Sequence, residues 1–257
     1  MNKIALITGA TAGIGKATAL LLAENNFDII ITGRRKNLLE DLKKEVLNRL
    51  KTGVLTLNFD IRNNNEVIRA IKNLPPRWKK IDVLVNNAGL AVGLNPVQSG
   101  KIDDWERMID TNIKGLLYIT RQISFIMIEN GFGHIINIGS IAGKEVYANG
   151  NVYCATKYAV EALTKGMRID MLKHNIKVTS ICPGMVETEF SIVRFKGDLE
   201  AAQKVYEGFT PLCAQDIAEA ILFAVTRPAH VNINDMLIMP TGQSNATHIF
   251  RKGSAVT

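Results

Sequence analysis

A tyrosine and a lysine in the middle of the chain have a spacing suited to proton transfer. Tyr153 and Lys157 lie four residues apart in the run Tyr-Cys-Ala-Thr-Lys, so they share one face of a predicted helix. An unperturbed phenol has a pKa of roughly 10, but a nearby ammonium favours the phenolate. Tyr153 could then take a proton from a hydroxyl or give one to a carbonyl. The same pair also arises by chance, as a half-buried tyrosine beside a surface lysine.

A serine upstream of this pair follows a strand-like run. Ser140 comes directly after the apolar stretch 134–138 and its glycine, 13 positions before Tyr153. Ligands of parallel sheets bind at the carboxyl ends of the strands. A hydroxyl there would orient the substrate oxygen and stabilise charge that develops on it. Considered alone, Ser140 is an ordinary turn residue.

A glycine-rich loop follows the first apolar run of the chain. Residues 8–15 read Thr-Gly-Ala-Thr-Ala-Gly-Ile-Gly. Glycines permit a tight turn and a close approach of the backbone to a diphosphate, and the next helix directs free N–H groups at the phosphates. A loop between a strand and a helix therefore predicts a dinucleotide site. The expected contacts are Gly9, Ala10, Thr11, Gly13, Ile14 and Gly15.

Two arginines indicate which dinucleotide binds. Arg34 and Arg35 follow the second strand-like run, and no acidic residue lies between Asp28 and Glu40. Two guanidinium groups can hold a ribose 2′-phosphate through forked, charge-assisted hydrogen bonds. The sequence therefore predicts that NADP(H) binds rather than NAD(H). The alternative is that both arginines are solvent-exposed residues at the start of a helix and contact no cofactor.

The segments that must position these residues alternate between strand and helix patterns. Apolar, β-rich runs occur at 4–8, 27–32, 54–58, 81–86, 134–138, 177–182 and 236–239. Helical patterns lie between them, while residues 188–210 are ambiguous. Strands that are apolar on both faces and alternate with helices predict a single-domain α/β fold: a Rossmann-type, doubly wound parallel sheet of about seven strands with helices on both faces. We expect the domain to span 1–240 and a C-terminal tail to span 241–257.

The composition narrows the functional classes. The chain has 257 residues and a net charge of +7, but its basic residues are scattered, which argues against nucleic-acid binding. Three widely spaced cysteines predict reduced thiols in a cytoplasmic protein, and four histidines without ligand spacing predict no metal site. We also expect no signal peptide and no membrane span.

These motifs together resemble the short-chain dehydrogenase/reductase family over nearly the whole chain. Residues 8–15 resemble its TGxxxGxG loop, residues 86–89 its NNAG motif and residues 183–188 its PGxxxT loop. The resemblance implies that Asn112, at a helix kink, completes a catalytic tetrad with Ser140, Tyr153 and Lys157. It implies further cofactor contacts from Asp60, Ile61, Asn87, Gly89, Tyr153, Lys157, Pro183, Gly184, Val186 and Thr188.

Three other stretches resemble a subgroup, the NADP-dependent 3-hydroxy acid dehydrogenases, which are also called serine or allo-threonine dehydrogenases. They are residues 86–93, 184–198 and 228–234. This resemblance implies oxidation of serine, L-allo-threonine, 3-hydroxyisobutyrate or 3-hydroxypropionate, or reduction of the matching semialdehydes. Such a substrate needs an anchor for its carboxylate, and Arg194 is the candidate; a surface arginine or an ion pair between subunits would explain it equally well.

Two other functions remain open. A broad carbonyl reductase or 3-oxoacyl reductase would use the same tetrad. A non-catalytic NADP(H)-binding regulator would be expected to lack Tyr153 or Lys157, and both are present. The resemblance also implies a homodimer or homotetramer, with helices near 112–129 and 152–174 in one interface and the last helix and strand in another.

Overall fold

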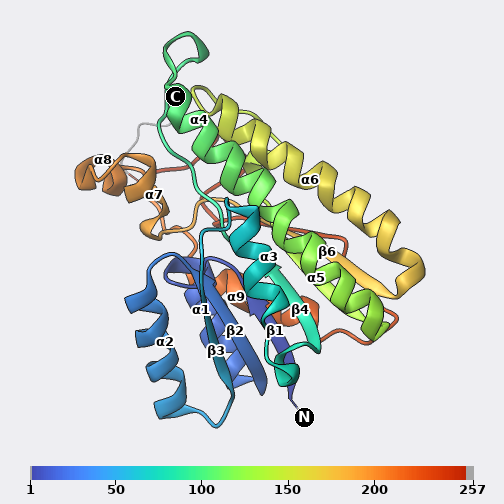
Figure 1. The fold of residues 1–257 in the computed structure, drawn as a ribbon. Helices are drawn as coiled ribbons and strands as arrows, with labels where there is room; N and C mark the ends of the chain where they lie inside the picture. Colours follow the sequence, from blue (N-terminus) through green and yellow to red (C-terminus); the bar gives the residue numbers. More distant parts are fainter. Residues whose placement is uncertain (1, 253–257) are drawn as a thin grey trace.

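The computed structural model describes residues 2–252, so the last five residues of the predicted tail lie outside the described part. Its centre is one sheet of seven parallel strands in the order β3-β2-β1-β4-β5-β6-β7 (Figure 1). The strands are β1 (Lys3–Ile7), β2 (Phe27–Gly33), β3 (Val54–Asn58), β4 (Ile81–Asn86), β5 (Gly133–Ile138), β6 (Ile176–Pro183) and β7 (Asp235–Ile238). The predicted Rossmann-type sheet is confirmed.

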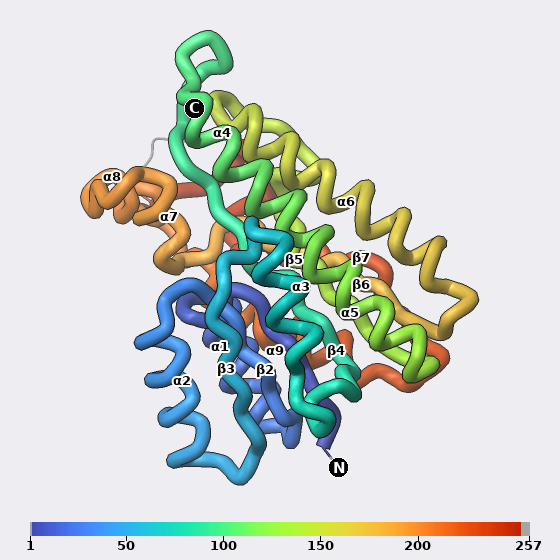
Figure 2. The backbone as a smooth tube through the Cα atoms, in the orientation of Figure 1, coloured from blue at the N-terminus to red at the C-terminus, as the bar shows by residue number. Residues whose placement is uncertain are grey.

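Helices cover both faces of this sheet because neighbouring strand residues point to opposite sides. In β1, Ala5 and Ile7 pack in one core with α1 (Gly13–Glu24), α2 (Lys36–Arg49) and α9 (Ala214–Val225). Ile4 and Leu6 pack in the other core with α3 (Asn64–Lys72), α5 (Leu116–Asn130) and α6 (Asn151–Met171). The backbone trace shows the two layers on either side of the strands (Figure 2).

The strand order reverses between β1 and β4. The chain runs outward from β1 to β3 on one side and from β4 to β7 on the other. Crossover connections leave a crevice at such a switch point, at the carboxyl ends of the strands. The loops that carry the predicted motifs meet at this edge.

Two segments differ from a simple helix–strand alternation. The ambiguous stretch contains two short helices, α7 (Glu189–Arg194) and α8 (Leu199–Lys204). The helix that follows β4 is interrupted: α4 (Ile102–Ile109) continues into a π-helical segment, Asp110–Gly115, before α5. Single π-helical turns inside helices widen the backbone and often occur at functional sites. In the described part of the chain, no helix has both the length and the apolar character that a membrane span requires.

One buried histidine makes the fold sensitive to acid. The Nε2 of His134, on β5, lies 2.8 Å from Thr179 Oγ1, and its buried Nδ1 has no hydrogen-bond partner among residues 2–252. Burial lowers the pKa of His134 from 6.5 to about 3, and Lys177 adds a smaller effect in the same direction. The unfolded chain therefore binds this proton more readily than the folded protein. We expect the free energy of unfolding to be constant near neutral pH and to fall by about 1.4 kcal/mol per pH unit below 6.5.

Urea unfolding at pH 7.5, 6.0 and 5.0 measures this contribution. His134→Gln should flatten the acid slope, while His230→Gln, which changes an exposed histidine, serves as the matched control. Equal slopes for wild type and His134→Gln would show that the acid sensitivity originates elsewhere.

Candidate active site

A cavity of about 630 Å³ opens at the carboxyl ends of the central strands. It collects most of the residues that the sequence singled out, from the glycine-rich loop to α7. The predicted residues that line it are Gly9, Thr11, Gly13, Ile14, Arg34, Arg35, Asp60, Ile61, Asn87, Gly89, Ser140, Tyr153, Lys157, Pro183, Gly184, Val186, Thr188 and Arg194. Ala10, Gly15 and Asn112 are buried behind its wall.

The glycine-rich loop presents an open helix terminus to the cavity. Gly9 and Gly13 have φ angles of +67° and +52°, which favour glycine. No side chain in the described part of the chain caps the N-terminus of α1 at Ala12, and the first turn of α1 holds no acidic residue. Its N–H groups and positive dipole end are therefore available for an anionic ligand, and a dinucleotide diphosphate fits this terminus.

Ala10 and Gly15, which the sequence predicts as cofactor contacts, hold the loop in shape. The backbone N–H of Ala10 donates to Thr32 O at 3.0 Å, which joins the loop to β2. Gly15 leaves space for the side chain of Asn87, whose Nδ2 donates to the Thr8 carbonyl at 2.8 Å. A Cβ at Gly15 would collide with that amide.

The two arginines beyond β2 have different partners. Arg35 donates to Thr11 Oγ1 at 2.8 Å and pairs with Glu189 Oε2 at 3.0 Å, so it ties the cofactor loop to α7. Arg34 is more than half exposed, and its nearest acid is Asp60 at 3.9 Å. Asp60 itself pairs with Arg62 at 2.6 Å. Of the two arginines, Arg34 thus has the weaker contacts within the protein, which would leave its guanidinium more available to a 2′-phosphate.

Tyr153 is buried on α6 beside Ser140. Burial raises the pKa of Tyr153 above its ordinary value, as does the neighbouring Tyr147, while Arg194 and a hydrogen bond with Ser140 act in the opposite direction. The net lowering that the sequence suggested is therefore absent in the protein alone, although Lys157 Nζ lies 6.0 Å from the ring centroid of Tyr153. Ser140 also caps a short turn by accepting from Ala142 N at 3.1 Å.

Lys157 and Asn112 face each other across Gly89. Lys157 Nζ donates to Ile138 O at 2.8 Å, and burial lowers the pKa of Lys157 to about 8. Asn112 lies in the π-helical segment, where its amide donates to Leu90 O and Thr156 Oγ1 and accepts from Leu90 N. A Cβ at Gly89 would stand 3.3 Å from Asn112 Oδ1 and 3.8 Å from Lys157 Nζ. Asn112 thus joins the β4 loop to α6 from within the π-helical segment.

Arg194 lies over Tyr153. Its guanidinium carbon is 5.2 Å from the ring centroid of Tyr153, 5.3 Å from that of Tyr147 and 5.9 Å from that of Phe190. It donates through Nη2 to the Tyr147 hydroxyl. Its Nε is buried and has no hydrogen-bond partner among the described residues. An unsatisfied charged donor beside Tyr153 is a feature of a site that binds an anion.

Several lining residues escaped the sequence analysis. Tyr147 lies in an irregular loop, and Gln243 comes from the tail, yet both reach the cavity. Gln243 Oε1 accepts from Met185 N at 2.9 Å, so the tail supports the loop after β6. No local pattern signals such contacts, because they depend on which loops meet at the sheet edge.

Known proteins resemble this chain in sequence. The profile of the family described as short chain dehydrogenase matches residues 3–198. NADP-dependent 3-hydroxy acid dehydrogenase YdfG of Salmonella typhi is 50% identical over 244 residues, which is 95% of this chain and 97% of the relative. Sulfoacetaldehyde reductase 2 of Chromohalobacter salexigens is 43% identical over 95% of this chain and 96% of its own.

A solved structure shares this fold. The closed form of a serine dehydrogenase complexed with NADP⁺ superposes with a TM-score of 0.91 and is 45% identical, covering 95% of this chain and 97% of that one. With the family profile and the curated relatives, this likeness establishes that the chain belongs to the short chain dehydrogenase family.

Proposed function

We propose that this protein is an NADP(H)-dependent oxidoreductase that acts on the 3-hydroxyl of small 3-hydroxy acids, or on the matching semialdehydes. Candidate substrates are serine, L-allo-threonine, 3-hydroxyisobutyrate and 3-hydroxypropionate. The observation that carries the choice of an acid is the buried, unpartnered Nε of Arg194 above Tyr153. The relatives named for 3-hydroxy acids and for serine support it.

The cofactor would lie along the loops at the sheet edge. The free N–H groups at the start of α1 would hold its diphosphate, Arg34 and Arg35 its 2′-phosphate, and Lys157 its nicotinamide ribose. When bound, NADP⁺ supplies the hydride acceptor for oxidation and a positive charge beside Tyr153.

Proton transfer in this proposal depends on Tyr153. During oxidation, the substrate hydroxyl gives its proton to the phenolate of Tyr153, while the carbon that bears the hydroxyl loses a hydride. Ser140 donates to the same substrate oxygen and aligns it. The ammonium of Lys157, 6.0 Å from the ring centroid of Tyr153, would favour the phenolate electrostatically and so counteract the effect of burial.

The carboxylate of the substrate would bind Arg194. In a 3-hydroxy acid, two carbon–carbon bonds separate the carboxylate carbon from the carbon that bears the hydroxyl. Arg194 and Ser140 both contact Tyr153, so one short molecule can reach the guanidinium and the hydroxyl together. Guanidinium and carboxylate form strong, charge-assisted hydrogen bonds.

Arg194→Ala is expected to raise KM for hydroxy acids by about 100-fold, the cost of one charge-assisted contact, with a much smaller change for a neutral aldehyde. Because Arg194 also acts on the Tyr153 pKa, kcat should change for both substrates, and the ratio of KM values isolates the anchoring role. Arg194→Lys keeps the charge, and Lys204→Ala removes an exposed cation of α8 as the control. Parallel KM changes for acid and neutral substrates would remove Arg194 from the substrate site.

The same assay distinguishes the alternatives. A guanidinium also binds a sulfonate, so sulfoacetaldehyde belongs in the substrate panel. Consumption of NADPH with bulky ketones or thioesters, and none with acids, would favour a broad carbonyl or 3-oxoacyl reductase.

We further propose a homodimer or homotetramer. Exposed apolar side chains of α5 and α6 supply a surface for association: Leu117, Phe125, Tyr158 and Ile169. We also propose that the protein is cytoplasmic and that residues 1–240 form a single domain. The tail as far as Lys252 packs near the loops at the sheet edge.

A further inference from the structure

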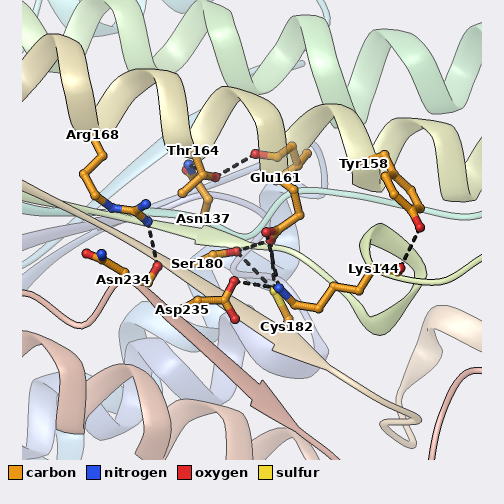
Figure 3. A network of polar contacts seen from close by, with 11 residues as sticks. Asn137, Lys144, Tyr158, Glu161, Thr164, Arg168, Ser180, Cys182, Asn234 and Asp235 are labelled. Atoms are coloured by element: carbon orange, nitrogen blue, oxygen red, sulfur yellow. Dashed lines mark hydrogen bonds and ion pairs between the residues drawn. The ribbon is translucent and has the colours of Figure 1, made fainter.

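A polar cluster lies between α6 and the strands β6 and β7. We call it the Glu161 cluster; it consists of Lys144, Glu161, Ser180, Cys182 and Asp235 (Figure 3). Glu161 Oε1 accepts from Ser180 Oγ at 2.5 Å and from Cys182 Sγ at 3.0 Å. Lys144 Nζ lies 3.4 Å from Glu161 Oε2 and 2.7 Å from Asp235 Oδ2. The cluster is therefore a charge network whose cation is Lys144.

This cluster adjoins the catalytic lysine. Glu161 lies one helical turn beyond Lys157 on α6, and both are buried. A Cβ at Gly139 would stand 3.1 Å from Glu161 Oε1, and Gly139 follows the residue whose carbonyl accepts from Lys157. A Cβ at Gly143 would stand 3.2 Å from Glu161 Cγ and 2.7 Å from the Lys157 carbonyl. The carboxylate therefore packs against the glycine backbone of the segment that holds the lysine, beside Cys182 Sγ, which lies 2.7 Å from the same Cβ position at Gly139.

Glu161 is the anion that acts on Lys157. Burial disfavours the charge of Glu161, but hydrogen bonds from Ser180 and Cys182 and the charge of Lys144 keep its pKa below the ordinary value. Burial lowers the pKa of Lys157, whereas Cys182 and Glu161 raise it. Burial also raises the pKa of Cys182 to about 12, so that side chain is a neutral thiol at working pH. The carboxylate supplies the negative charge.

On the cavity side of Lys157, the neighbouring described groups carry no negative charge. Arg194 lies on the cavity side over Tyr153, and Tyr147 lies beside it as a neutral phenol. Asp235 faces Lys144 rather than Lys157. Lys157 forms no ion pair with the described residues, and its ammonium donates to one carbonyl.

We propose that Glu161 is a positioning residue that keeps the buried ammonium of Lys157 charged, and that Lys144 limits this effect by sharing the same carboxylate. The inference deepens the proposed function, since a charged Lys157 is what favours the phenolate of Tyr153. The two residues should therefore act on Lys157 in opposite directions, although both belong to one cluster.

The direct test is the titration of Lys157 in the protein without cofactor, followed by NMR of ¹³Cε-labelled lysine, with Lys157→Arg to assign the signal. Glu161→Gln should lower the midpoint by about one pH unit or more, and Lys144→Gln should raise it. The double variant should lie between them. This measurement needs no substrate, so it stands even if the proposed substrates fail.

A second readout is the pH profile of kcat/KM for oxidation, with whichever substrate the enzyme turns over. Its alkaline limb reports loss of the Lys157 proton and should move in the same two directions. Lys144 is partly exposed, so Lys144→Gln provides a test even if Glu161→Gln folds poorly. Unchanged midpoints, or midpoints that move in the same direction in both single variants, would overturn the proposal.

Discussion

Tyr153→Phe is expected to lower kcat about 1,000-fold and to leave NADPH binding nearly unchanged. The substitution removes the oxygen that, in the proposed function, exchanges a proton with the substrate, and general acid–base catalysis is worth roughly 10²–10⁴-fold. The phenyl ring remains, so the contacts with Arg194 and the edge-on packing against Phe190 persist. The loss should therefore fall on chemistry rather than on binding.

Steady-state kinetics and NADPH fluorescence titration measure the two quantities separately. Tyr118→Phe removes a hydroxyl from α5, outside the cavity, and should keep wild-type activity. A Tyr153→Phe variant that retains more than a tenth of wild-type kcat would remove Tyr153 from the role of acid and base.

The double substitution Arg34→Ala, Arg35→Ala is expected to raise KM for NADP⁺ by at least about 100-fold and to change KM for NAD⁺ little. Each guanidinium contributes a charge-assisted contact to the 2′-phosphate, and NAD⁺ has no such group. Arg35 also pairs with Glu189, so the single variants should differ: Arg34→Ala should carry the larger share of the loss.

Lys36→Ala, which removes the next exposed cation along the chain, is the matched control for charge. Equal losses for NADP⁺ and NAD⁺ in the double variant would mean that the two arginines stabilise the loop rather than select the cofactor. A larger loss for Arg35→Ala would show that the phosphate displaces Glu189 from Arg35.

The sequence predicted the sheet because its signals are local. Apolar runs in β1 and β4 and the glycines beside them reflect burial and backbone conformation that each segment requires alone. Tyr153, Lys157 and Ser140 could be predicted as site residues for the same reason. Ser140 follows one strand, and the other two share one face of one helix.

Contacts between distant segments could not be predicted in this way. The stacking of Arg194 on Tyr147 and Tyr153 joins α7 to a loop and to α6, and the pairing of Lys144 with Glu161 and Asp235 joins three separate elements. Ala10 and Gly15 match the glycine-rich pattern but pack inside the loop. A sequence motif contains both the residues that contact a ligand and the residues that pack inside the loop, and the motif alone does not distinguish them.

The most direct test of the central claim is NADP⁺ reduction by the purified protein with L-allo-threonine, L-serine, 3-hydroxyisobutyrate and 3-hydroxypropionate, beside Tyr153→Phe and with NAD⁺ in place of NADP⁺. The account predicts turnover of at least one hydroxy acid that requires both NADP⁺ and Tyr153. No turnover of any hydroxy acid, with NADPH consumed on bulky ketones instead, would contradict it.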